Sequence, residues 1–190
     1  MKTLCSFLLL LALASSFRSM AAGAFVEAGA HLGGDTLVEV SFTDGSTESL
    51  KAGQLISLAV GWHTELSETL SSRISLGYKF DSITAQNGDI EFTRVPLELL
   101  LLTQNGSWLV GGGVTYHMSP KFTADAATIG LLGTAKLDDA LGFVLAADYN
   151  THGIFDREWY IGARITVVDY ENNLGSVSGS SIGVVIGYLF

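Results

Sequence analysis

The chain has 190 residues, with 22 glycines, two prolines and many β-branched and aromatic residues, and this composition is typical of a single all-β domain. Its formal net charge is −9 and it has no basic stretch, which excludes a nucleic-acid-binding role. After the N-terminal segment, no stretch is apolar enough to form a membrane-spanning helix. Any crossing of a membrane must therefore be made by strands.

The N-terminal segment MKTLCSFLLLLALASS is typical of a secretory signal peptide. Lys2 precedes an apolar run at 4–14, and the small residues of SMAAGAF follow, so we expect cleavage after Ala21 or after Ala24. A membrane-spanning helix is the alternative, but a run of about eleven residues is shorter than the ~20 that a span needs. Because the single cysteine, Cys5, lies in this segment, we expect an exported chain without a disulfide or a lipid anchor.

We therefore expect a signal peptide at 1–24 and one mature domain at 25–190. The leader carries two of the ten basic residues, so eight remain against 19 acidic residues, a net charge of about −11. Tight turns are predicted in DGS at 44–46, QNGD at 86–89 and QNGS at 104–107, where Asn or Gly can adopt a positive φ. Eight segments of alternating polar and apolar residues are predicted as strands: 25–42, 48–66, 70–82, 90–102, 108–118, 141–150, 158–170 and 180–190.

The alternation gives each segment one apolar face and one polar or small face. In the fourth segment Leu97, Leu99 and Leu101 share one face, and Arg94 and Glu98 share the other. A soluble sandwich is the alternative, but its polar faces would point to water, whereas the polar face here is narrow and charged. The pattern predicts an all-β fold, an eight-stranded antiparallel up-and-down transmembrane β-barrel with its apolar face outward.

Aromatic residues sort into two heights along this predicted barrel, as expected for the two interfaces of a membrane. With both chain ends in the periplasm, the inner girdle consists of Trp62, Trp108 and Trp159, and the outer girdle of Tyr78, Phe92, Tyr116 and Tyr170. A general preference of aromatic residues for strands is the alternative, but it predicts no sorting by height. The predicted inner connections are short and the outer connection at 119–140 is long, which agrees with the barrel.

The last segment, SIGVVIGYLF, places Val184, Ile186, Tyr188 and Phe190 on one face. This terminus resembles the signal by which the barrel-assembly machinery recognises outer-membrane proteins. The mature chain resembles the small eight-stranded barrels of Gram-negative bacteria, the grouping of the OmpA membrane domain, OmpX and OmpW. The resemblance implies a location in the bacterial cell outer membrane, insertion by that machinery, and contact with outer-membrane lipids and lipopolysaccharide. We expect a monomer.

The interior of an eight-stranded barrel is just wide enough for side chains to fill it. The inward charged residues carry both signs: Glu27, Arg73, Lys79, Asp81, Arg94, Glu98, Asp148 and Arg164. Counted from the Asn-Gly turns, Asp81 lies opposite Arg94. We interpret these charges as a packed network that fills the lumen; the alternative is a path for protons or small solutes.

The same counting places Glu98 opposite Gly113 on the next strand. A glycine leaves room for a basic side chain from across the lumen, and a buried carboxylate needs such a partner to offset its desolvation. Arg73 and Arg164 are the candidates.

Catalysis is not indicated by the arrangement of nucleophiles and bases. His31, His63 and His117 point inward, and no serine and histidine pair faces the lipid, where an acyl substrate would lie. We expect no catalytic, cofactor or metal site. The predicted role is structural or surface-interacting; a narrow, porin-like channel for small or apolar solutes is the alternative, and a lipid A-modifying enzyme is a third possibility.

The first two strands are long enough to protrude beyond the outer interface as a hairpin. Val38, Val40 and Phe42 alternate along it, and they either pack against the 119–140 connection or offer an edge to a partner. Acidic residues crowd this end and are either solvated or linked to lipopolysaccharide phosphates by divalent cations. They are Asp35, Asp44, Glu48, Asp81, Asp89, Asp125, Asp138, Asp139, Asp169 and Glu171.

Overall fold

The computed structural model describes residues 22–41, 45–85, 88–126, 131–151, 159–172 and 175–190. The predicted signal peptide thus lies almost wholly outside the described residues. The strands are β1 (Ala22–Gly33), β2 (Thr36–Ser41), β3 (Thr47–Lys51), β4 (Leu55–Glu65), β5 (Leu70–Ala85), β6 (Gly88–Asn105), β7 (Trp108–Ala126), β8 (Leu131–Lys136), β9 (Ala140–Asn150), β10 (Trp159–Val167), β11 (Asp169–Asn172), β12 (Gly175–Ser178) and β13 (Ser181–Leu189). The described part of the chain contains no helix of the length and hydropathy needed to span a bilayer.

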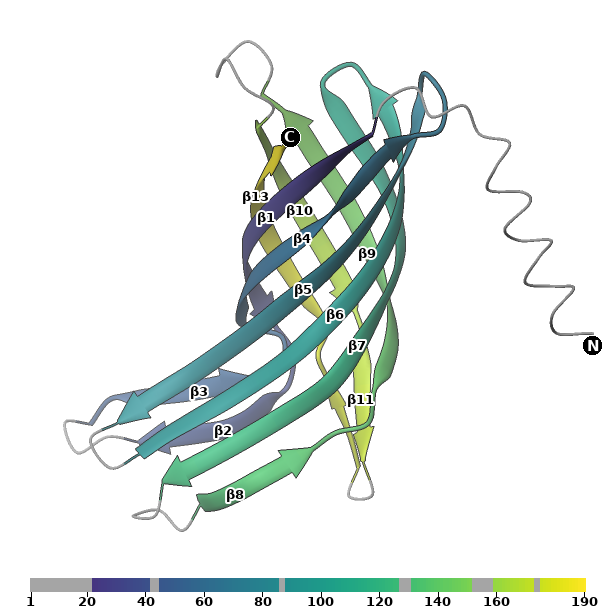
Figure 1. Ribbon diagram of the computed structural model, residues 1–190. Helices are drawn as coiled ribbons and strands as arrows, with labels where there is room; N and C mark the ends of the chain where they lie inside the picture. The colour runs from purple at the N-terminus through teal and green to yellow at the C-terminus, as the bar shows by residue number, and fades with distance from the viewer. Residues whose placement is uncertain (1–21, 42–44, 86–87, 127–130, 152–158, 173–174) are drawn as a thin grey trace, which may run out of the picture.

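Eight of these strands close into a barrel (Figure 1). Each pairs antiparallel with the next in the order β1, β4, β5, β6, β7, β9, β10 and β13, and β13 pairs with β1 to complete the circle. This confirms the predicted eight-stranded antiparallel barrel. Both β1 and β13 reach the same end, here called the terminal end, and the opposite end is called the loop end.

Side chains alternate strictly between the two sides of the barrel wall. Exposed and buried residues follow each other without interruption along β10 and over 181–187 of β13. On β6, Leu99 is 48% exposed whereas the next residue, Leu100, is 3% exposed. The outside is a continuous belt of Leu, Ile and Val, which a water-soluble protein rarely exposes. The predicted apolar-out arrangement is therefore confirmed.

The loop end carries a folded extension that is here called the cap. It consists of the β2–β3 hairpin, the ends of β5, β6 and β7 beyond the barrel, β8, and the β11–β12 hairpin (Figure 1). These segments enclose an apolar core of buried residues: Val40, Leu50, Ala52, Leu55, Ile83, Ile90, Phe92, Ala124, Ala140, Val168 and Tyr170. Val38, Phe122 and Leu137 pack against this core, so the predicted packing of the first hairpin on the 119–140 connection is confirmed for Val38 and Val40. Phe42 lies outside the described residues.

The prediction of two uninterrupted strands at 25–42 and 48–66 is wrong. Gly33 and Gly34 have φ values of 128° and 75°, a left-handed conformation that ends β1 and lets the chain turn. Asp35 then accepts a backbone hydrogen bond from Ala52 at 2.8 Å, which ties the base of the β2–β3 hairpin together. The longest strands are instead β6, with 18 residues, and β7, with 19 residues, and both continue beyond the barrel into the cap.

Both predicted hairpin registers are wrong by two residues. Ala85 pairs with Gly88, so Gly88 belongs to the ladder and not to the turn, and Asp81 lies opposite Phe92. On the other side of β6, Asn105 pairs with Trp108, and Glu98 lies opposite Thr115. A shift of two residues changes every cross-strand partner but keeps each side chain on its predicted face.

Two of the predicted girdle residues are misplaced. Phe92 and Tyr170 are fully buried in the cap core, not exposed to lipid. By alternation, Phe92 points to the same side as Arg94, and Tyr170 to the same side as Arg164, which is the inside. Both lie in the cap, beyond the predicted outer interface. The other predicted girdle residues point outward: Trp62, Trp108 and Trp159 at the terminal end, and Tyr78 and Tyr116 toward the loop end.

Candidate functional site

At the terminal end of the barrel, a vestibule of about 350 Å³ is lined by His63, Tyr160 and Phe190 among others. Arg73 also lines it, with 6% of its side chain exposed. The guanidinium of Arg73 lies 5.1 Å from the ring centre of Phe25 and 4.5 Å from that of Tyr160. This cation and the two rings form the inner boundary of the vestibule.

Behind this boundary, one carboxylate binds two arginines. Arg73 donates to Asp148 at 2.7 Å, and both terminal nitrogens of Arg164 also donate to Asp148, whose side chain is fully buried. Arg164 donates in addition to Glu27 at 2.7 Å, and Tyr160 donates to the same carboxylate oxygen at 2.9 Å. The five side chains form one continuous hydrogen-bonded layer across the lumen, which stabilises the barrel as long as every charge is paired.

Two inward glycines give this layer its space. A Cβ atom on Gly162 would lie 2.0 Å from the Asp148 carboxylate, and one on Gly187 would lie 2.1 Å from the Tyr160 ring. Gly162 is paired with Asp148 across the β9–β10 ladder, so the missing side chain is what allows the carboxylate to turn toward Arg164. The charged layer thus depends on Gly162 beside Asp148 and on Gly187 beside Tyr160.

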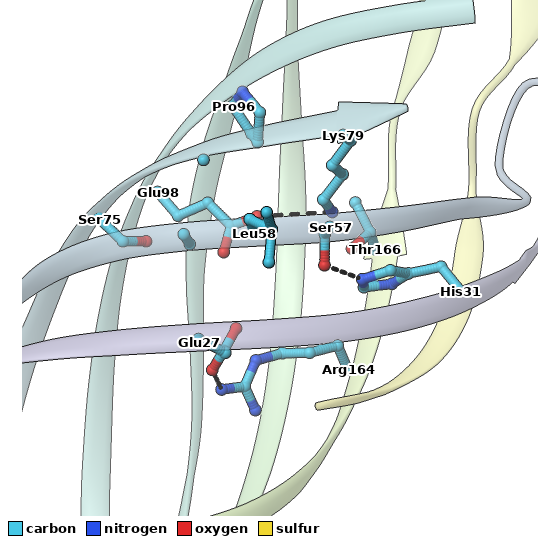
Figure 2. A pocket seen from close by; sticks show the side chains of 12 residues that line it. Glu27, His31, Ser57, Leu58, Ser75, Lys79, Pro96, Glu98, Arg164 and Thr166 are labelled. Atoms are coloured by element: carbon cyan, nitrogen blue, oxygen red, sulfur yellow. Dashed lines mark hydrogen bonds and ion pairs between the residues drawn. The ribbon is translucent and has the colours of Figure 1, made fainter. Parts of the chain in front are cut away.

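A small cavity of about 20 Å³ lies in the middle of the lumen (Figure 2). Lys79 Nζ is 3.8 Å from Glu98, which also accepts a hydrogen bond from Thr115 at 3.4 Å. The predicted pairing of Glu98 with Arg73 or Arg164 is wrong, because both arginines bind Asp148 and Lys79 pairs with Glu98 instead. A water needs roughly 10–15 Å³ by the same measure, so the cavity holds little more than one water.

A serine and histidine pair also lines this cavity, where His31 Nε2 lies 2.9 Å from Ser57 Oγ (Figure 2). Sequence reasoning considered only pairs that face lipid and missed it, although both residues have inward parity. No carboxylate within the described residues bonds to the other ring nitrogen, His31 Nδ1. The pair is 4% and 7% exposed and faces the closed lumen, so an acyl chain in the bilayer does not reach it.

A second layer of side chains crosses the lumen below the cap. Arg94, 1% exposed, donates to the backbone carbonyl of Ala52, and its guanidinium lies 5.3 Å from the ring centre of Tyr170. The Tyr170 hydroxyl is 2.5 Å from Nδ1 of His117. Burial raises the pKa of Tyr170, so its phenol stays protonated and can donate this hydrogen bond. Beyond this layer lies the apolar cap core, which covers the lumen on the loop side.

Asp81 is the predicted network residue that the structure does not bring into these layers. Its carboxylate is partly exposed near the cap and accepts a hydrogen bond from the backbone of Ser82 at 3.0 Å. Tyr160 and Thr115 take part in the layers but were absent from the sequence-based set. Their inward parity was readable, whereas their cross-lumen partners depend on the register. Within the described residues, no three His, Cys, Asp or Glu side chains are grouped so as to hold a metal ion.

The residues of the predicted assembly signal lie along the outward face of β13. Val184 and Ile186 are 64% and 47% exposed, and the rings of Tyr188 and Phe190 meet edge to face at 4.9 Å. The backbone N–H of Phe190 donates to Ala24 at 2.8 Å, so the last residue joins β13 to the start of β1.

Comparison with known proteins finds the fold but no sequence family: no family model and no curated protein matches the chain. Among solved structures, Ail of Yersinia pestis, in complex with the heparin analogue sucrose octasulfate, is 11% identical with a TM-score of 0.59, over 89% of this chain and 97% of Ail. Neisserial surface protein A is 11% identical with a TM-score of 0.55, over 90% of this chain and 99% of that protein. The chain has the fold of the small eight-stranded outer-membrane barrels.

Proposed function

We propose that this protein is a non-conducting outer-membrane barrel of Gram-negative bacteria with a structural or surface-interacting role. The observation that carries this proposal is the filled lumen. Two layers of side chains and an apolar cap lie between the vestibule and the loop end, and the cavity between the layers is about 20 Å³. A solute path would need a continuous polar passage, and a small-solute channel is therefore the less favoured alternative.

The outer face supports the membrane location. Three tryptophans lie at the terminal end, and Tyr78, Tyr116 and Phe143 point outward nearer the loop end, with Leu, Ile and Val between them. Two aromatic belts that flank an apolar band are what a bilayer selects. The turn between β4 and β5 and the turn between β6 and β7 at the terminal end are short, which favours the periplasm for this end and the cell exterior for the cap.

The charge of the cap indicates the kind of partner that it suits. Among the described residues of the cap, two lysines are exposed, Lys121 and Lys136, against ten exposed acidic residues: Asp35, Glu39, Glu48, Asp89, Glu91, Asp125, Asp138, Asp139, Asp169 and Glu171. Asp44 of the predicted set lies outside the described residues. Ail binds the polyanion sucrose octasulfate in its solved complex, but an acidic cap would repel a polyanion. We therefore favour cationic partners, including divalent cations that join the cap to lipopolysaccharide phosphates.

Enzymatic modification of lipid A is not favoured. The serine and histidine pair that the lumen contains, Ser57 and His31, is separated from the bilayer by the barrel wall. General-base catalysis of acyl transfer requires the pair to meet the acyl carbonyl directly.

The location and orientation are tested by labelling introduced cysteines on whole cells. Cys5 is the only native cysteine, so Thr134→Cys in β8 and Glu68→Cys in the turn after β4 each give one reporter. We expect a membrane-impermeant maleimide to label Thr134→Cys on intact cells and Glu68→Cys only after the outer membrane is permeabilised. Labelling of Glu68→Cys alone on intact cells would reverse the orientation, and labelling of neither after permeabilisation would contradict the location.

A further inference from the structure

The first three residues of β1, Ala22–Ala24, are part of the barrel wall. Ala22 pairs with Thr64 of β4, Gly23 with His63, and Ala24 with Trp62. These pairs continue without a break into the rest of the β1–β4 ladder. Their loss would leave the last residues of β4 as an open strand edge at the end of the barrel, which folded sheets avoid.

The same three residues hold the closing seam between β1 and β13. The last paired residues of the seam are Phe25 and Leu189, and one further hydrogen bond runs from the Phe190 N–H to the Ala24 carbonyl at 2.8 Å. If the chain were cut after Ala24, this carbonyl would leave with the leader, and the C-terminal residue would lose its only backbone bond to β1 among the described residues.

Gly23 is fitted to the end of the chain. A Cβ atom at this position would lie 2.5 Å from the backbone oxygen of Phe190. Real Cβ atoms essentially never come so close to a backbone atom, so any larger residue would push the C-terminus away. A glycine matched to a contact in the finished barrel is a feature of the mature chain, because a residue discarded during export makes no such contact.

We propose that the leader is cleaved between Ala21 and Ala22, and not after Ala24, so that the mature protein begins at Ala22. Both bonds satisfy the small-x-small rule, with Ser19 and Ala21 before the first and Ala22 and Ala24 before the second, which is why the sequence leaves them equivalent. The fold distinguishes the two cleavage sites, since only a cut after Ala21 retains Ala22–Ala24, which complete the barrel wall.

The direct test is the intact mass and N-terminal sequence of the protein extracted from the outer membrane. We expect a chain that begins at Ala22. A chain that begins at Phe25, shorter by two alanines and one glycine, or at any other residue, overturns the proposal.

A matched pair of variants tests the cleavage site independently of folding. Signal peptidase requires a small residue directly before the cut, so Ala21→Leu should slow processing or move the cut to the bond after Ala24, whereas Ala24→Leu should be processed as fast as the wild type and still begin at Ala22. Ala24 shares the outward parity of Val26, where a leucine fits the apolar belt. The precursor and mature forms are separated by gel mobility after a short pulse of labelling. Accumulation in Ala24→Leu with normal processing in Ala21→Leu would overturn the proposal.

Discussion

The shared carboxylate of Asp148 is the point at which the interior is most vulnerable. It is fully buried and accepts hydrogen bonds from both Arg73 and Arg164. Asp148→Asn keeps the shape and removes the charge. Arg164 would retain Glu27 at 2.7 Å, but Arg73 would lose its carboxylate partner and be left with a neutral amide and the rings of the vestibule boundary. Breaking a buried ion pair from one side costs about 3–5 kcal/mol, because the remaining charge is desolvated and unpaired.

We therefore expect Asp148→Asn to lower the free energy of unfolding by about 3–5 kcal/mol, or roughly two to four orders of magnitude in the unfolding equilibrium constant. The assay is equilibrium urea unfolding in phospholipid vesicles, followed by tryptophan fluorescence. Asp169→Asn is the matched control, since this aspartate is exposed on the cap, and its effect should stay within about 0.5 kcal/mol.

A second substitution separates lost charge pairing from lost packing. Adding Arg73→Met to Asp148→Asn removes the stranded cation, so the double variant should recover part of the lost stability. Equal stability of Asp148→Asn and Asp169→Asn would refute the interpretation of the lumen as a paired, water-poor network.

Three further changes test other parts of the structure. Leu99→Arg, on the outward face of β6, should cost about 2–4 kcal/mol in the same vesicle assay if this residue lies at mid-membrane depth, and a neutral result would invert the assignment of the two faces. Gly162→Ala would force its Cβ against the Asp148 carboxylate and should destabilise by about 1–3 kcal/mol; an unchanged urea midpoint would show that the layer tolerates displacement. Deletion of Phe190 should reduce the heat-modifiable folded form in the outer membrane without impairing export, and assembly at the normal rate would argue against a role in assembly.

Sequence periodicity was sufficient to predict the wall of the barrel. The side chains of a strand alternate with a period of two, so the faces of Leu99 and Leu100 follow from parity whatever the pairing. Cross-strand partners depend in addition on which residues form the turn. In QNGD the Asn-Gly pair was the strongest hairpin signal, yet the last pair of the ladder is Ala85 and Gly88. Because of this difference of two residues, Arg94 lies opposite Lys79 and not opposite Asp81.

The interior partners could not be predicted for a related reason. Arg73 and Asp148 are 75 residues apart in sequence and come from strands that are not neighbours in the barrel. Their contact depends on the tilt and stagger of all the strands between them, which no local pattern contains. The sequence did not predict the separate short strands of the cap. Polar and apolar residues alternate in the same way whether the strand at 25–42 is continuous or is broken at Gly33 and Gly34, as it is in the structure.

The central claim, that the lumen is closed, is tested most directly by the conductance of the purified protein in planar lipid bilayers. The filled layers at Asp148 and Arg94 and the apolar cap predict no steps of current above those of the bare bilayer, at any voltage that the bilayer withstands. Reproducible single-channel steps from the wild-type protein, with an ion selectivity that changes in Asp148→Asn, would contradict the account and establish the lumen as a path.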